Sequence, residues 1–207
     1  MPKRLTRQES QARTQAQLMA AGARVFARAG FEAASVEEIA EAAGFSRGAF
    51  YANFQSKEDL FLAILEERRR AELAGLLAMF EGDAPLPERL AKVREHYAGH
   101  AEDRDWCLLS VEFQMLVVRN PKIRERVAGI YREYRAAATR LVAQIFVDSG
   151  VPAPAPPETL AAALMALSEG LSLHQLVDPK SVSAARVGET LDYFFSQLIA
   201  SQPARSS

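Results

Sequence analysis

Apolar side chains recur at intervals of three and four residues along nearly the whole chain. Between positions 14 and 29, Leu18, Ala21, Val25 and Phe26 follow this spacing, which places them on one face of an α-helix. Sustained polar–apolar alternation, Asn-Gly turns and β-branched runs, which are the signals of strands, are missing from the sequence. The pattern therefore predicts an all-α fold of about nine helices.

Glycine and serine residues predict where the opening helices end and begin. Gly30 and Gly44 are expected to end the first two helices, because glycine is common just beyond a helix C-terminus. A serine can cap each of the second, third and fourth helices. We place these helices at about 36–43, 47–51 and 57–80, after Ser35, Ser46 and Ser56. Glu38 follows Ser35 by three residues, which is the pattern of a capping box.

Proline marks the ends of the longer helices further along the chain. Asn120-Pro121 and the proline-rich segment 149–157 interrupt the apolar stripes, because proline cannot continue a helix. The last two helices are expected at about 158–176 and 184–200.

Two short helices with a glycine-containing turn between them predict a helix-turn-helix in the first quarter of the chain. The first reads "VEEIAEAA" and the second "SRGAFY". Gly44 lies in the turn, where a residue with a Cβ atom would be strained. Ala40 is small enough for the two helices to cross closely. In this motif the second helix enters the major groove of DNA.

The residues of the second short helix suit contact with DNA. Arg47 can form two hydrogen bonds to guanine, the commonest base-specific contact. Gly48 and Ala49 have almost no side chain, so the backbone can lie close to the groove. Donors that can reach phosphate groups or helix-terminal N–H groups come from Ser46, Tyr51, Asn53 and Lys57.

These residues belong to a longer stretch that resembles the N-terminal domain of the tetracycline-repressor (TetR) family. The resemblance covers about residues 13–65 and includes "SVEEIAEAAG", "SRGAFYANF" and "SKEDL". It implies that the third helix reads the major groove and that Tyr51 and Lys57 contact phosphates. It also implies phosphate contacts at the helix caps, Thr14 or a neighbour and Ser35. Asn53 departs from the family pattern, in which histidine or tyrosine is common.

The resemblance also implies how the chain divides. Residues 1–57 would form the DNA-binding domain, and its basic segment 3–13, which includes Arg13, would lie along DNA or reach a minor groove. Residues 58–207 would form a larger helical domain for ligand binding and dimerisation. The fourth helix would belong to both parts and transmit the ligand signal.

The last two helices carry an apolar stripe that fits a dimer interface, and the resemblance implies a four-helix bundle with a second subunit. Ordinary core packing within one chain is the alternative. The expected contacts are Leu164, Leu167, Leu171, His174, Leu191, Phe194, Phe195 and Leu198.

Candidate ligand contacts are less sharply defined, because aromatic and methionine residues at helical spacing are usually core. The candidates are Tyr97, Trp106, Phe113, Tyr131, Met165 and Glu169. The charge run "EERRRAE" at 66–72 is expected on a solvated helix face with i,i+4 pairs. Cys107 is either an inert thiol or an oxidant sensor.

Charge and composition narrow the possible functions. The 207 residues carry a net charge of −1, but the first thirty hold six lysines and arginines against Glu9 alone. This distribution is typical of a local anion-binding surface, and for residues 1–10 a solvated, disordered tail is the alternative. No apolar run reaches the roughly 18 residues of a membrane helix, and the basic start lacks the apolar segment of a secretory signal. One cysteine and three scattered histidines give no disulfide, metal or cofactor pattern. These features favour the cytoplasm.

The sequence thus predicts a DNA-binding, ligand-responsive transcriptional regulator. We expect a homodimeric repressor that a small, largely apolar effector releases from a palindromic DNA operator. The alternative is an architectural DNA-binding protein without an inducer. An enzyme is not expected, because no catalytic triad, paired carboxylates, phosphate-binding glycine loop or metal spacing is present.

Overall fold

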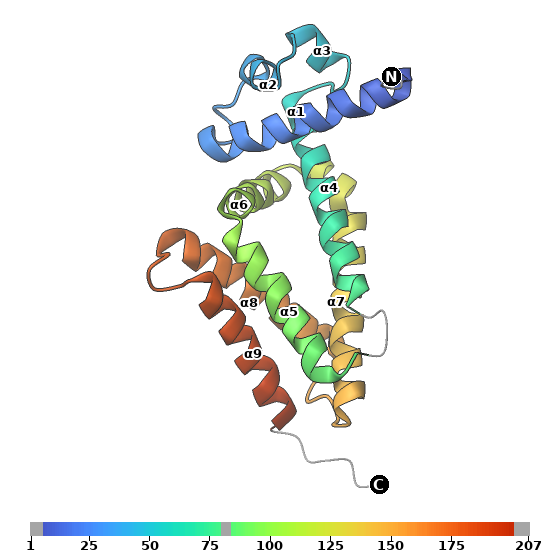
Figure 1. Cartoon of the computed structure of the whole chain (residues 1–207), viewed down its shortest axis with the longest axis vertical. Helices are drawn as coiled ribbons and strands as arrows, with labels where there is room; N and C mark the ends of the chain where they lie inside the picture. Colours follow the sequence, from blue (N-terminus) through green and yellow to red (C-terminus); the bar gives the residue numbers. More distant parts are fainter. Residues whose placement is uncertain (1–5, 80–83, 201–207) are drawn as a thin grey trace, which may run out of the picture.

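The computed structural model describes residues 6–79 and 84–200, and within these ranges the chain forms nine α-helices and no strand, which confirms the all-helical prediction. Figure 1 shows a small head above a larger body, with α4 running from one into the other. The helices are α1 (Arg7–Ala29), α2 (Val36–Ala42), α3 (Arg47–Tyr51), α4 (Lys57–Ala78), α5 (Leu86–Glu102), α6 (Arg104–Arg119), α7 (Pro121–Ser149), α8 (Pro157–Val177) and α9 (Ala184–Ala200).

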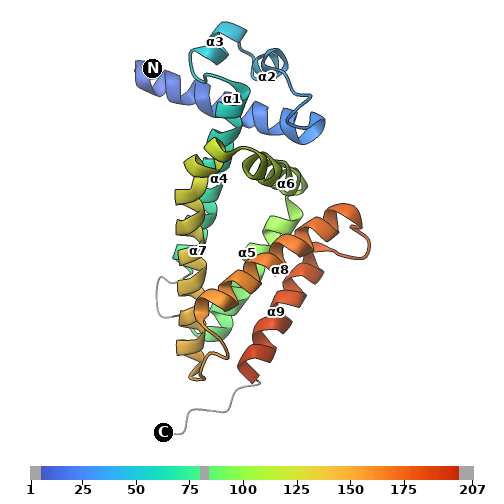
Figure 2. The ribbon, with the colours of Figure 1, turned by 180° about the vertical axis from the view of Figure 1, so that it is seen from behind.

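The head consists of α1, α2 and α3, and α1 lies across the first turns of α4 (Figures 1 and 2). Its core is aromatic: the rings of Phe26, Phe31 and Phe61 lie with centroids 5.0–5.6 Å apart. Gly22 allows α1 to approach α4 closely, because a Cβ atom there would lie 2.7 Å from Cδ2 of Leu60. Small and aromatic residues together therefore fix the head on α4.

The body packs α4 beside α7 and α5 beside α9, while α8 crosses against α7 and α9 (Figures 1 and 2). Helix α6 lies crosswise beneath α1 and contacts it. A second apolar core fills the body, with Val142, Ile145, Leu164, Leu191 and Phe195 almost completely buried. Both α4 and α6 therefore connect the body to the head.

Helix α1 begins seven residues earlier than the sequence predicted. Thr6, not Thr14, is the N-cap: its hydroxyl accepts from the Glu9 N–H at 3.2 Å, and the Glu9 carboxylate accepts from the Thr6 N–H at 2.7 Å. Thr14 lies inside the helix, where its hydroxyl donates to the Ser10 carbonyl at 3.0 Å. Residues 7–13 of the predicted arm are thus helical and Thr6 caps them, while residues 3–5 of the arm fall outside the described ranges.

The caps of α2, α3 and α4 lie where the sequence placed them. Ser35, Ser46 and Ser56 each accept a backbone N–H three residues on. The predicted capping box at Ser35 is only half formed, because the carboxylate of Glu38 pairs with Arg28 of α1 instead. That ion pair joins α2 to α1.

Three residues predicted at a dimer interface belong to the core of this chain. Leu164, Leu191 and Phe195 are at most 2% exposed and pack with α5 and α7 residues, so they have no surface to offer a partner. Helical periodicity shows that residues share a face but not what covers it. Of the other predicted contacts, His174 is exposed, and Leu167, Leu171, Phe194 and Leu198 are partly buried.

Helix α8 is long and apolar enough to cross a membrane by length and composition, a property that the sequence reading missed. In the fold it packs on α7 and α9, and it carries Glu169 and His174. Only 22% of its most apolar window is buried inside this chain. Much of the apolar surface of α8 is thus not buried in the core of this chain.

Candidate functional site

The turn between α2 and α3 has the geometry that the sequence predicted. Gly44 adopts φ +76°, a conformation that side chains with a Cβ atom rarely take. The N–H of Phe45 donates to the Ala40 carbonyl at 2.8 Å, which folds the chain back after α2. The Ser46 hydroxyl then accepts from the Ala49 N–H at 3.2 Å and starts α3. Local hydrogen bonds therefore set the angle between the two helices.

Helix α3 presents a polar and small-residue face to solvent. Phe50 is completely buried and packs near Phe54, which anchors the helix on the head. Arg47, Gly48 and Tyr51 are exposed on the remaining surface. A short helix that is anchored by one ring and open on its outer face can lie against a nucleic acid without rearrangement.

The Arg47 side chain is positioned on this face by two neighbouring residues. Its guanidinium pairs with Glu37 of α2 and lies 5.5 Å from the centre of the Tyr51 ring. Both side chains of the ion pair are more than half exposed, so solvent weakens it. Arg47 can therefore exchange Glu37 for an acceptor on DNA at little cost.

The Lys57 side chain binds backbone carbonyls of the protein and does not extend toward a phosphate as predicted. Its ammonium donates to the carbonyls of Phe31, Glu32 and Ala34 at 2.8, 2.9 and 3.2 Å. An ammonium has three donors, and all three are used here. The side chain thus fixes the loop between α1 and α2, and we correct the expectation that its charge faces phosphate.

Asn53 is also turned toward the protein. Its Nδ2 donates to the Ala49 carbonyl at 2.8 Å and closes the last turn of α3, so this donor does not point at a phosphate. Ser35 and Ser46 are exposed, and their hydroxyls, which accept the capping hydrogen bonds, still have a proton to donate. Arg13 is exposed on α1.

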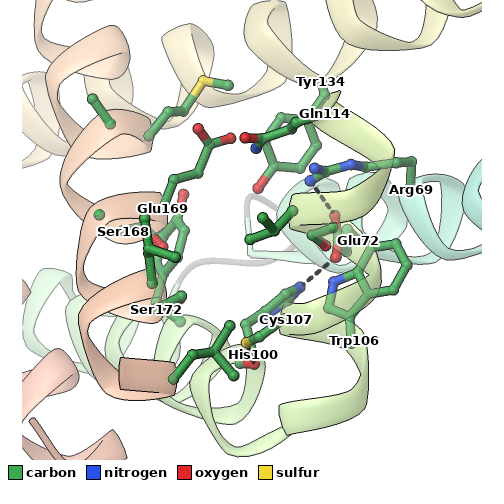
Figure 3. A pocket seen from close by; sticks show the side chains of 18 of the residues that line it. Arg69, Glu72, His100, Trp106, Cys107, Gln114, Tyr134, Ser168, Glu169 and Ser172 are labelled. Carbon is green, nitrogen blue, oxygen red and sulfur yellow. Dashed lines mark hydrogen bonds and ion pairs between the residues drawn. The ribbon is translucent and has the colours of Figure 1, made fainter. Parts of the chain in front are cut away.

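A cavity of about 490 Å³ opens between α4, α5, α6, α7 and α8 (Figure 3). Four predicted ligand contacts line it, namely Tyr97, Trp106, Met165 and Glu169. Phe113 does not, because it is fully buried in the core that joins α6 to the head. Tyr131 lines only a much smaller void beside the cavity, next to Arg69. Aromatic and methionine residues at helical spacing thus predicted part of the cavity lining, but they did not distinguish lining residues from core residues.

The charge run 66–72 contains the main cavity residues that the sequence reading missed. Arg69 and Glu72 face inward, and Glu72 is only 3% exposed. Nη1 of Arg69 lies 2.8 Å from Oε2 of Glu72, and Nε2 of His100 lies 2.9 Å from Oε1 of the same carboxylate (Figure 3). The His100 contact is an ion pair whose N–H is poorly aligned for a hydrogen bond. The predicted solvated face is confirmed for Arg70, which is exposed and pairs with Glu66 at i,i+4, but it was wrong for Arg69 and Glu72.

The pKa values within this triad follow from burial and close partners. Burial opposes the charge of Glu72, but the contacts with His100 and Arg69 outweigh it and lower the pKa of this carboxyl. Burial also opposes the charge of His100, yet the contact and negative charge of Glu72 raise the pKa of the imidazole. Next to it, burial and the charge of His100 lower the pKa of His96 to about 4. His96 is therefore neutral near pH 7.

Aromatic rings surround the Arg69 guanidinium. Its central carbon lies 5.5–5.8 Å from the centres of the Trp106, Tyr131 and Tyr134 rings, a distance at which cation–π attraction operates. Burial raises the pKa of Tyr134 to about 12, so its phenol stays protonated. The triad and its rings thus form one rigid wall of the cavity.

Cys107 lines the same cavity as a buried thiol. Its Sγ donates weakly to the His100 carbonyl at 3.4 Å. Burial, followed by the charge of Asp103, raises the pKa of the Cys107 thiol. A thiol that resists ionisation reacts slowly with oxidants, which favours the inert alternative.

Comparison with known proteins places both halves of the chain among bacterial regulators. Residues 18–64 match the family model "Bacterial regulatory proteins, tetR family", and residues 87–200 match "BetI-type transcriptional repressor, C-terminal". Together the two matches include the helix-turn-helix and most of the cavity.

Individual relatives agree with these matches. The HTH-type transcriptional repressor AcnR of Corynebacterium diphtheriae is 33% identical over 103 residues, which is 50% of each chain, so the alignment spans about half the length of that relative. The HTH-type transcriptional regulator YfiR of Bacillus subtilis is 26% identical over 92% of this chain and 94% of its own. A transcriptional regulator from Saccharomonospora viridis, crystallised in complex with choline, shares the fold with a TM-score of 0.77 at 22% identity, covering 89% of this chain and 96% of that one.

The role of Lys57 can be tested by its removal. Lys57→Met keeps the length of the side chain but leaves three carbonyls without their donor, and we expect the free energy of unfolding to fall by about 1–2 kcal/mol. Urea denaturation measures this. Lys122→Met, at an exposed position of α7, is the matched control and should change stability by less than about 0.5 kcal/mol. Equal stability of the two variants would show that the carbonyl contacts are not important.

The His100–Glu72 pair predicts a pH dependence of stability. The pKa of His100 is raised on folding, so its contribution is complete below about pH 6.5 and is lost as the pH rises through the raised value. The groups facing the ring are Glu72 and Arg68 of α4 and the neutral His96 of α5. We expect the stability advantage of the wild type over His100→Gln to shrink as the pH rises above about 6.5. Urea denaturation at several pH values measures it.

The control for this experiment is His174→Gln, at an exposed position of α8. It should remain parallel to the wild type across the pH range. If His100→Gln also remained parallel, His100 would not be ionised preferentially in the folded protein.

Proposed function

Since the chain belongs to the TetR family of bacterial regulatory proteins, we propose that it is a transcriptional repressor which a small effector releases from its DNA operator. The observation that supports this most directly is the path of α4. This helix begins beneath the helix-turn-helix head at Lys57 and forms part of the cavity wall at Arg69 and Glu72. A ligand in the cavity and a DNA site on the head therefore share one rigid element.

Helix α3 is the proposed reading element. Arg47 would contact base edges, and Gly48 would allow the backbone to lie close to the groove. The exposed hydroxyls of Ser35, Ser46 and Tyr51 would contact phosphates and set the register. Lys57 would act indirectly, because it holds the loop that orients α2.

Two copies of the chain would bind a palindromic operator as a homodimer through α8 and α9. Exposed apolar side chains support this surface: Val177 is 79% and Tyr193 is 66% exposed, and Leu173 lies nearby on α8. Leu167 and Leu171, which are only partly buried against the core, add apolar area on another face of α8. The partner would cover the apolar area that α8 does not bury within its own chain.

Effector binding would change the population of two head arrangements. Helix α6 gives a second connection besides α4, because the Glu112 carboxylate accepts from the Phe31 N–H at 2.6 Å at the base of the head. Gln114 on the same helix lines the cavity. A ligand that displaces α4 or α6 would therefore rotate both heads out of register with their half-sites. The protein would act in the cytoplasm, on the nucleoid when it is bound to DNA.

An architectural DNA-binding protein with the same head is the second candidate. It would need no effector, and a fully packed C-terminal domain would favour it. A cavity of about 490 Å³ falls within the size range of small-molecule sites, which favours the ligand-responsive regulator.

The DNA-binding proposal can be tested by selecting sequences from random duplex DNA. The wild type should enrich a palindrome, and Arg47→Ala should lose preference at one symmetric pair of positions, at a cost of about 1–3 kcal/mol per site. Tyr51→Ala should weaken binding to all sequences alike. Fluorescence anisotropy at several salt concentrations measures the affinities, which should fall steeply with salt.

Arg132→Ala, at an exposed position of α7 in the body, is the control and should bind like the wild type. Unchanged base preference in Arg47→Ala would show that this residue does not read bases. The absence of any DNA binding at low salt would exclude the proposed function of the head.

A further inference from the structure

The cavity wall carries one carboxylate that has no ion-pair partner among the described residues. The ionisable side chains that could carry charge at the wall are Arg69, Glu72, His100 and Glu169. Arg69 and His100 both contact Glu72. Glu169, on α8, is at the opposite side, where its carboxylate points into the cavity toward Gln114 (Figure 3). Glu169 is therefore the carboxylate of the described wall that is left to pair with a ligand.

The cations of the wall already have an ion-pair partner in Glu72. Nη1 of Arg69 and Nε2 of His100 both lie against Glu72, and Nε2 has almost no accessible surface. Nδ1 of His100 lies 2.6 Å from the His96 carbonyl, which can only accept, so this nitrogen is the donor. An anionic ligand would have to compete with Glu72 for these cations, and it would also face Glu169.

The aromatic part of the wall favours the same sign of charge in a ligand. Ring faces are electron-rich and attract cations. The rings of Trp106 and Tyr134 already hold the Arg69 guanidinium on one side, and Glu72 neutralises that guanidinium. Both rings also line the cavity, together with Met115, Met165 and Leu173. A ligand with an apolar body and a positive head would match these surfaces.

We propose that the cavity binds an organic cation, an amine or a quaternary ammonium ion with an apolar body, and that Glu169 is its anchoring residue. The proposal rests on the proposed role of this cavity as the effector site. The cationic head lies between the Glu169 carboxylate and the ring faces, and the body extends along the methionine and leucine side chains. No bond to the ligand forms or breaks.

Trp106 makes the test direct, because it is the only tryptophan of the chain and lies in the cavity wall. Its fluorescence is titrated with octyltrimethylammonium, octanol and octanoate, which share one alkyl chain and differ in charge. We expect a saturable change with each probe that fits, at the lowest concentration for the cation and the highest for the anion. Glu169→Gln should lower the affinity for the cation roughly five- to tenfold and leave the affinity for octanol unchanged.

Two further variants sharpen the test. Glu169→Lys should reverse the preference, so that octanoate binds more tightly than octyltrimethylammonium. Glu158→Gln removes an exposed carboxylate from the first turn of the same helix, and it should bind all three probes like the wild type. Because Glu169 is exposed, these variants should fold, and circular dichroism melting curves check that they do.

The outcomes separate the two proposals. If octanoate bound the wild type more tightly than the cation, or if Glu169→Gln bound the cation unchanged, the charge assignment would be overturned while the effector cavity would stand. If none of the probes changed Trp106 fluorescence, the cavity would not be the effector site, and the inference would fail together with that part of the proposed function. The DNA selection would still report on the head separately.

Discussion

A buried carboxylate, Glu72, is the constraint around which the ligand-facing part of the structure is organised. Taking an unpaired carboxylate out of water costs several kcal/mol, so a position that is 3% exposed needs cationic partners at fixed places. Arg69 supplies one from the preceding turn of α4, and His100 supplies the other from the end of α5. The rings of Trp106 and Tyr134, from α6 and α7, then enclose Arg69. Four helices are thereby held around one charge, and the space between them and α8 remains open as a cavity.

The loop after α1 is where this framework meets the head. Lys57 of α4 donates to three carbonyls of that loop, and Glu112 of α6 accepts the N–H of Phe31 in the same loop. Two helices that line the cavity therefore fix a single short segment of the DNA-binding domain from both sides. If only α4 were attached, the head could rock on one helix. With two attachments, a change in the angle between α4 and α6 becomes a rotation of the head. The sequence predicted that α4 alone links the cavity to the head, and the structure adds a second link through α6.

Sequence reading succeeded where structure is decided locally and failed where it depends on distant partners. Gly44 and Ser46 set their turn through hydrogen bonds within five residues, so the helix-turn-helix could be predicted almost residue by residue. Glu72 lies among charged residues that are spaced like exposed ion pairs on a helix. Its burial depends on the packing of α5, which brings His100, 28 positions later, against it. Lys57 was misread in the same way, because its acceptors lie 23–26 residues earlier. Leu164 has the periodicity of an interface, yet α5 and α7 cover it.

Helix α8 explains how one element can serve the core, the cavity and the proposed dimer. Leu160 and Leu164 face the core, Met165 and Glu169 line the cavity, and Val177 is exposed to solvent. In the proposed dimer, an effector would have to change the distance between two heads, so a signal would have to reach the other subunit as well as the head of the same chain. A ligand held between Glu169 on α8 and the rings around Arg69 would bridge the helix that we propose faces the partner and the helix that carries the head. The position of the unpaired carboxylate on α8, opposite the triad, is therefore the arrangement that a repressor of this kind would need.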